Sequence, residues 1–130
     1  MVEHELSPIT AKDGTRLYTT TNHVETPIAG VIIIHGLGEH IGRYDHVYEA
    51  LAEKQVVAYG MDLRGHGRSE GRRGHTPSYD LLMEDIEELM KTFRSDYNEL
   101  PMFLFGHSMG GNLVVNYVIR KKTNELRGFV

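Results

Sequence analysis

One serine stands between two glycines in Gly106-His107-Ser108-Met109-Gly110, a G-x-S-x-G pattern. The pattern follows the apolar run 101–105 and precedes a segment of helical periodicity. In such a strand–turn–helix setting, a sharp turn lifts a serine hydroxyl above a sheet as a nucleophile. Glycines flank it because side chains there would collide where strand and helix converge. We therefore expect Ser108 to attack a carbonyl carbon in acyl transfer. The alternative is a glycine-rich connection with an ordinary serine.

A serine hydroxyl at its ordinary pKa is a poor nucleophile, so it needs a base and donors for the oxyanion that develops. The segment His35-Gly36-Leu37-Gly38 follows the apolar run 29–34. A loop at this place can supply one backbone N–H, and the residue after the nucleophile supplies a second. The sequence therefore predicts an oxyanion hole made by the N–H groups of Leu37 and Met109. Alternatively, these glycines only make a tight turn.

These motifs need a scaffold, and the hydrophobic pattern indicates one. Three apolar runs read as buried strands, at 29–34, 56–62 and 101–105. Helical spacing is found between and after them, at 44–53, 82–97 and 110–121. Strand and helix thus alternate, which predicts an α/β fold with a mostly parallel sheet covered by helices.

Local signals refine this scaffold. Asp13-Gly14 tolerates the positive φ of a tight turn and predicts an antiparallel edge hairpin between 5–10 and 16–21. Thr76-Pro77 is typical of a helix start, with the threonine as N-cap. Four acidic residues of that helix read as a solvated face rather than a cation site: Glu84, Asp85, Glu87 and Glu88.

Composition narrows the class of protein. The chain has 130 residues and a formal net charge of −4, which disfavours a nucleic-acid binder with a basic surface. It has no cysteine, so disulfides and thiolate sites are excluded. No apolar run approaches the ~18 residues of a membrane span, and the first residues do not resemble a secretory signal. We expect a single cytoplasmic domain without a transmembrane segment.

Three blocks together resemble the monoacylglycerol lipase and lysophospholipase branch of the α/β-hydrolases. They run from His35 to Tyr44 (HGLGEHIGRY), from Asp62 to Gly71 (DLRGHGRSEG) and from Gly106 to Gly111 (GHSMGG). The resemblance implies an α/β-hydrolase fold and serine ester hydrolysis without a cofactor or a metal, with a small lipid ester as substrate. The middle block lacks the lysine of a phosphate-binding loop. In the family it is a turn after a strand, so Asp62 and Arg64 are expected to hold loops by hydrogen bonds.

Carried over from the family, the nucleophile is Ser108 and the oxyanion donors are the N–H groups of Leu37 and Met109. Glu39 and Arg43 match positions at the polar end of the pocket, where a glycerol head group would lie. An ion pair between these two residues, one helical turn apart, explains them equally well. Two further histidines, His35 and His40, are expected to support the oxyanion loop.

The remainder of the catalytic triad has no counterpart in the sequence. In this fold the acid and the histidine base follow the serine. All eight histidines precede Ser108, and the only later carboxylate is Glu125. His107 adjoins the nucleophile, but neighbouring side chains on such a turn diverge. We therefore expect residues 1–130 to be the N-terminal part of one hydrolase domain, truncated after the nucleophile helix, without the cap and C-terminal strands, and inactive alone.

The leading hypothesis is a monoacylglycerol lipase or lysophospholipase of which this chain supplies the nucleophile and oxyanion hole. Within enzymes, a general carboxylesterase or an aminopeptidase of the same fold competes with it. A different class is also open: a non-catalytic half-domain that associates with itself or with another chain. For either class, a complementary C-terminal chain is an expected partner.

Overall fold

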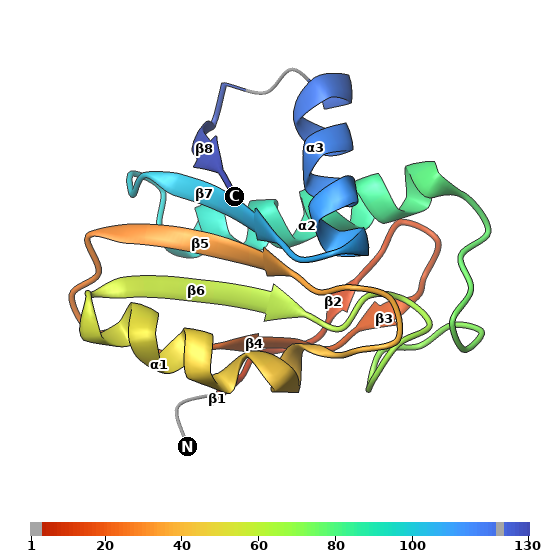
Figure 1. Ribbon diagram of the computed structural model, residues 1–130, viewed down its shortest axis with the longest axis horizontal. Coiled ribbons are helices and arrows are strands. Elements are labelled where there is room, and N and C mark those ends of the chain that lie inside the picture. The colour runs from red at the N-terminus through yellow and green to blue at the C-terminus, as the bar shows by residue number, and fades with distance from the viewer. Residues whose placement is uncertain (1–3, 122–123) are drawn as a thin grey trace.

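From residue 29 onward, strands and helices alternate in the computed structural model, which describes residues 4–121 and 124–130. The strands are β1 (His4–Glu5), β2 (Ile9–Thr10), β3 (Arg16–Leu17), β4 (Thr19–Thr21), β5 (Ala29–Ile34), β6 (Val56–Met61), β7 (Met102–Gly106) and β8 (Leu126–Phe129). The helices are the 3₁₀ turn η1 (Ile41–Tyr44), α1 (Asp45–Glu53), α2 (Tyr79–Asp96) and α3 (Met109–Lys121). The predicted α/β alternation is confirmed (Figure 1).

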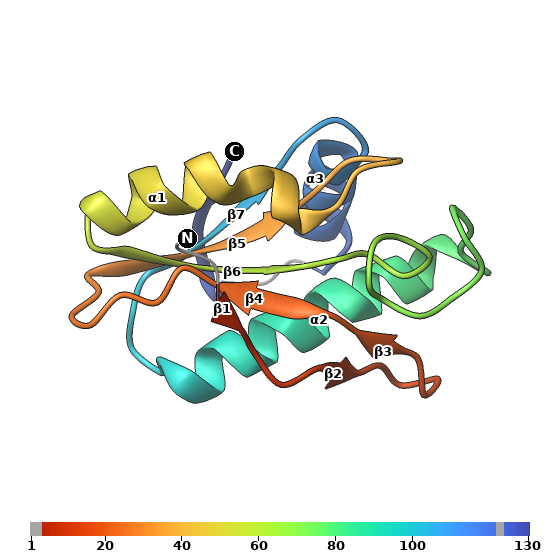
Figure 2. The same ribbon diagram turned by 90° about the horizontal axis from the view of Figure 1, so that it is seen from below.

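The main sheet has the strand order β1-β4-β6-β5-β7-β8, and its strands from β6 to β8 are parallel. Central strand β5 is buried on both faces, which accounts for its unbroken β-branched run. Ile32 belongs to the larger core beneath α2 and α3, whereas the next residue, Ile33, belongs to a second core beneath α1. Figure 2 shows α1 and α2 on opposite faces of the sheet. The mostly parallel sheet is thus covered on both sides.

The predicted N-terminal hairpin is present, but its arms are divided. Strands β2 and β3 pair around the Asp13-Gly14 turn as a separate two-stranded sheet, and Gly14 has a φ of 88°. Farther from the turn, β1 pairs with β4, and β4 joins β6 antiparallel at the main sheet. The hairpin therefore both extends the main sheet and packs Ile9 and Leu17 into the larger core.

Two predictions about α2 are wrong. The N-cap is Ser78, whose side chain accepts a hydrogen bond from the Leu81 N–H, and not Thr76. Asp85 is fully buried and is not part of a solvated face. Its carboxylate is held by Arg64, 21 residues earlier in the chain. In both cases a tertiary or backbone contact outweighs the local sequence signal.

The parallel strands bring three connecting segments to one edge of the sheet. The carboxyl ends of β5, β6 and β7 lie side by side, so the segments that follow them, beginning at residues 35, 62 and 107, share that edge. In open α/β sheets this is where ligands bind. Within the described residues, no helix has the length and apolarity to span a membrane.

Candidate active site at the carboxyl edge of the sheet

The turn between β7 and α3 holds Ser108 in a left-handed conformation, with a φ of 58°. A non-glycine residue with positive φ is strained, and such strain is concentrated at functional sites. The flanking glycines are needed sterically. A Cβ on Gly106 would lie 2.3 Å from the Gly110 carbonyl oxygen, and one on Gly110 would lie 2.1 Å from the Ile34 carbonyl oxygen. Strand, turn and helix are therefore as close as the prediction for a nucleophile turn requires.

The segment after β5 lies directly against this turn. A Cβ on Gly36 would be 3.2 Å from the Ser108 Cβ and 3.1 Å from the His107 carbonyl oxygen. The His107 N–H also donates to the Ile34 carbonyl, at 3.2 Å. Within the described part of the chain, neither the Leu37 N–H nor the Met109 N–H donates to a protein acceptor. Two backbone N–H groups without a protein acceptor are therefore available near the serine, one on the residue after Gly36 and one on the residue after Ser108.

Asp62, just after β6, fastens the loop after β5 to the neighbouring turn. One carboxylate oxygen accepts from the Ile41 N–H at 2.7 Å, and the other accepts from the Arg68 N–H at 2.8 Å. The Ser69 hydroxyl donates to the Asp62 carbonyl at 2.5 Å. These contacts confirm the expectation that Asp62 holds loops by hydrogen bonds.

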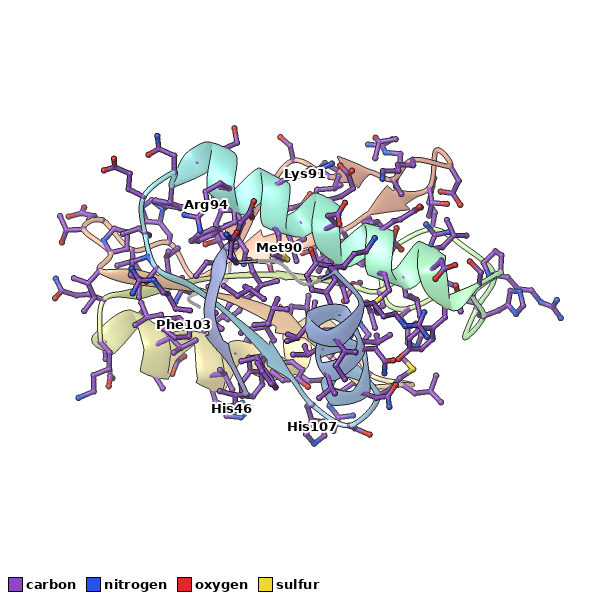
Figure 3. All side chains as sticks on the ribbon, turned by 90° about the horizontal axis from the view of Figure 1, so that it is seen from above. His46, Met90, Lys91, Arg94, Phe103 and His107 are labelled. Atoms are coloured by element: carbon purple, nitrogen blue, oxygen red, sulfur yellow. The ribbon has the colours of Figure 1, made fainter. Side chains whose placement is uncertain are left out.

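Glu39 and Arg43 line an open pocket of about 380 Å³ beside the nucleophile turn, together with Leu37, Gly38, Tyr44, His46, Val47, Phe105 and His107. Figure 3 shows His46 and His107 on the same side of the molecule, although they come from α1 and from the turn after β7. The structure thus brings both predicted head-group residues and the Leu37 donor to one cavity. The pocket has apolar and polar walls, as an ester of a polar alcohol would need.

The Glu39 carboxylate does not pair with Arg43. It lies 3.2 Å from His107 Nδ1, and the Tyr44 hydroxyl donates to it as well. Burial opposes its ionisation, but these hydrogen bonds together lower the pKa of Glu39 below its ordinary value. The alternative interpretation of Glu39 and Arg43 as an ion pair is therefore wrong. The Gly36 N–H donates to the same carboxylate, so three donors hold Glu39 in the wall of the pocket.

The pairing of Glu39 with His107 was missed from the sequence, because 68 residues separate them. The sequence nevertheless contains a signal for this pairing. Both residues belong to the motifs predicted to meet at the carboxyl edge of the sheet, one in the H-G-x-G-E block and one in the G-x-S-x-G block. Placing the two motifs against each other would have placed these side chains together.

Arg64 forms a second charged cluster, and this one is buried. Its guanidinium donates to Asp85 at 2.6 and 2.9 Å and to Asp13 at 2.7 Å. It joins the hairpin turn, the loop after β6 and helix α2, which confirms its predicted role of holding loops. The hydrogen bonds to Asp85 raise the pKa of Arg64, and Arg64 lowers the pKa of Asp13.

The histidines near the site differ in what their ring nitrogens can do. His35 is fully buried, and both of its nitrogens have backbone partners. The neighbouring His66 donates to the Arg64 carbonyl through Nδ1, while its buried Nε2 has no partner among the described residues. Within the same residues, no group of three or more acidic or histidine side chains is arranged to hold a metal ion.

Comparison with known proteins agrees with this geometry. Residues 25–130 match the family described as serine aminopeptidase, S33. Monoglyceride lipase of Rattus norvegicus is 36% identical over 99 residues, which are 76% of this chain and 33% of that protein. The chain therefore spans about a third of that relative.

Solved structures show the same fold. A thermostable carboxyl esterase from Bacillus coagulans in complex with glycerol has a TM-score of 0.87 at 28% identity, covering 99% of this chain and 43% of the esterase. A soluble variant of monoglyceride lipase from Saccharomyces cerevisiae, in complex with a substrate analog, has a TM-score of 0.83 at 27% identity, covering 96% and 43%. The α/β-hydrolase fold predicted from the sequence is confirmed.

Proposed function

The chain belongs to the serine aminopeptidase S33 family of α/β-hydrolases, and from that premise we propose that it supplies the nucleophile and oxyanion hole of an ester hydrolase. The observation that carries the proposal is the strained Ser108, at a φ of 58°, with Gly36 against its side chain and two unused N–H groups beside it. Monoacylglycerols and lysophospholipids are the substrates we favour, because Glu39 and Arg43 are among the residues that line the adjoining pocket.

In the proposed reaction, the Ser108 Oγ attacks the ester carbonyl and a histidine base accepts its proton. The N–H groups of Leu37 and Met109 stabilise the tetrahedral oxyanion. The histidine returns the proton to the leaving glycerol oxygen, which leaves an acyl-enzyme. Water then attacks that ester, and the fatty acid is released.

We assign the base and its acid to a segment that is not in this sequence. His35 has both ring nitrogens occupied by backbone groups, and His107 is turned to Glu39. The chain also spans less than half of the hydrolase structures it matches. We therefore propose that residues 1–130 are the N-terminal part of one domain, that they are nearly inactive alone, and that a complementary C-terminal chain restores activity.

Head-group recognition is the second element of the proposal. Hydrogen bonds lower the pKa of Glu39, which favours the carboxylate that would accept from a glycerol hydroxyl, and Arg43 offers donors in the same pocket. The resemblance of the fold to an esterase that was crystallised with glycerol is consistent with such a site. A general carboxylesterase or an aminopeptidase would not need this polar pair. A lysophospholipase activity and a cytoplasmic location remain predictions.

A non-catalytic role has one observation in its favour. β8 is the last strand of the sheet among the described residues. Apolar side chains are exposed on α3 (Val115 and Ile119), at the end of β8 (Phe129) and just after it (Val130). An open edge beside an apolar surface favours association with a second chain. On this alternative, the chain would fold by pairing with itself or with another half-domain, and Ser108 would have no reactivity.

Labelling with a fluorophosphonate separates the two classes. The chain would be treated alone and after mixing with a second chain that carries the remaining strands, an acid and a histidine. Hydrolysis of a monoacylglycerol, a p-nitrophenyl ester and an amino-acid amide would be followed in parallel. We expect labelling and monoacylglycerol turnover in the mixture only, and neither in Ser108→Ala. An unlabelled Ser108 in a folded mixture would favour the non-catalytic role, and full turnover by the chain alone would contradict the missing base.

A further inference from the structure

His35 is the residue through which the loop after β5 is fixed from inside. It follows the last residue of the strand, and its side chain is fully buried. Its Nδ1 lies 2.7 Å from the Gly36 carbonyl oxygen, and its Nε2 lies 2.9 Å from the Leu63 backbone nitrogen. Both ring nitrogens are thus used by main-chain groups of two different loops.

The hydrogen bond with Leu63 determines which ring nitrogen of His35 carries the proton. A backbone N–H can only donate, so His35 Nε2 must accept from Leu63. Nδ1 then carries the hydrogen and donates it to the Gly36 carbonyl. Burial lowers the pKa of His35, which keeps the ring in this neutral form. Leu63 therefore selects the tautomer that can hold Gly36.

The Gly36 carbonyl and the Leu37 N–H belong to the same peptide unit. The described residues contain no cis peptide bond, so these two groups point in opposite directions. A donor bound to the carbonyl on the buried side leaves the N–H directed away from His35. A Cβ on Gly36 would lie 3.2 Å from the Ser108 Cβ, so this peptide lies beside the proposed nucleophile. The Gly36 carbonyl also accepts from the Glu39 N–H at 3.4 Å, so His35 supplies the shorter of the two hydrogen bonds that hold this peptide.

We propose that His35 is a positioning residue of the oxyanion hole: its Nδ1–H holds the Gly36–Leu37 peptide so that the Leu37 N–H faces the reacting carbonyl, and the Leu63 N–H fixes the required tautomer. The inference rests on the proposed function for its catalytic consequence. Asp62 assists from the same strand end, since its carboxylate holds Ile41 at the far end of the loop. The loop is thus held at both ends by the segment that follows β6, and Leu37 lies between these two contacts.

Replacing His35 by asparagine or by glutamine separates the hydrogen bond to Gly36 from the hydrogen bond to Leu63. In His35→Asn, the side-chain NH₂ can take the place of Nδ1 and donate to Gly36, while Leu63 loses its acceptor. In His35→Gln, the amide oxygen can reach the place of Nε2 and accept from Leu63, while the Gly36 carbonyl keeps only the longer hydrogen bond from the Glu39 N–H. A purely structural role would make the two variants alike, or would favour the one that keeps Leu63 satisfied.

The kinetic test compares both variants with the parent chain in the mixture with its complementary chain, after circular dichroism has shown equal folding. Removing one oxyanion donor lowers kcat about a hundredfold or more. We expect His35→Gln to lose about a hundredfold in kcat with KM little changed, and His35→Asn to stay within about tenfold of the parent. Equal losses, or a greater loss in His35→Asn, would overturn the inference.

A spectroscopic test does not depend on activity. In the chain labelled with ¹⁵N-histidine and ¹⁵N-leucine, we expect His35 to show a protonated Nδ1 and an unprotonated Nε2. The Leu37 amide resonance should shift in His35→Gln and stay near its parent position in His35→Asn. A protonated Nε2 would overturn the inference. If the parent has no turnover, the proposed function fails, and the histidine and leucine spectra still decide how the peptide is held.

Discussion

Two charged clusters of the molecule use the same kinds of groups in opposite surroundings. In the cluster around Arg64, the guanidinium and the Asp85 carboxylate are 3% and 1% exposed. In the cluster around Glu39, the partner His107 is 65% exposed and the carboxylate itself is 15% exposed. The first joins three segments of the backbone, and the second lines an open pocket.

The difference in burial separates stability from recognition. A buried pair is strongly destabilising to break, because the remaining charge has neither water nor a partner. An exposed pair contributes little to stability, since water competes for both groups. The Arg64 cluster should therefore matter for folding and the Glu39 cluster for ligands, even though both adjoin the loops that carry the site. The following substitutions test that division.

Arg64→Met should have the largest effect on stability. It leaves Asp85 buried without a partner, and breaking a buried pair in this way typically costs about 3–5 kcal/mol in the free energy of unfolding. Urea denaturation followed by circular dichroism would measure it. Arg64→Met with Asp85→Leu should recover most of the loss, because the orphaned charge is then removed.

Arg120→Met provides the matched control. Arg120 pairs with Asp80, and both side chains are largely exposed. The expected change is below about 1 kcal/mol. If Arg64→Met and Arg120→Met lowered the free energy of unfolding equally, burial would not distinguish the clusters, and the proposed division would be wrong.

Leu37→Pro should affect activity instead of folding. Proline removes the backbone N–H, which should cost about 3–4 kcal/mol of transition-state stabilisation and lower kcat a hundredfold or more. Leu37→Ala keeps that N–H and should be mild. Turnover would be measured in the mixture with the complementary chain. Comparable kcat values in the two variants, both folded, would refute the assignment of Leu37 as a donor.

The sequence predicts what local pattern determines. Strand 29–34 was predicted to the residue, because an unbroken β-branched run is what a strand buried on both faces requires. The strand before the nucleophile was displaced by one residue, and the turn itself was located correctly. The three connecting segments of the site could be placed because parallel strands align their carboxyl ends.

Contacts between distant residues were not predictable in this way. Asp85 looks like any other residue of an acidic helix face, and only the fold shows Arg64 beneath it. For Glu39, spacing favoured Arg43 as partner, while the structure gives it His107 and Tyr44. The local pattern identifies which loops carry charge, and tertiary packing decides which charges meet.

Glu39→Ala and Arg43→Ala should change substrate preference and leave stability nearly unchanged. If these residues hold a glycerol group, each loss removes a hydrogen bond to a charged group, which corresponds to roughly a tenfold to a hundredfold loss of kcat/KM on a monoacylglycerol. A p-nitrophenyl ester lacks that group and should be affected much less. The measurement is the ratio of kcat/KM for the two substrates. Equal losses of kcat/KM on both substrates would contradict the assignment of Glu39 and Arg43 to head-group binding.

The smallest effect is expected at the exposed end of the Arg64 cluster, where the Asp13 side chain is 36% exposed. The hydrogen bond from Arg64 lowers the pKa of Asp13 far below its ordinary value of 3.8, so the folded protein binds this proton less readily than the unfolded chain. Its contribution to stability is therefore present above about pH 3.8 and is lost as the pH falls toward the lowered value.

Asp13→Asn removes this titration while keeping a hydrogen-bonding side chain at the turn. It should lower the free energy of unfolding by less than about 1 kcal/mol at neutral pH and flatten its decline below pH 4. Urea denaturation from pH 2 to pH 7 would follow both effects, with Asp80→Asn as the control, since that carboxylate is 84% exposed. A decline that remains as steep in Asp13→Asn as in the parent would mean that Arg64 stabilises the fold through the buried Asp85 alone.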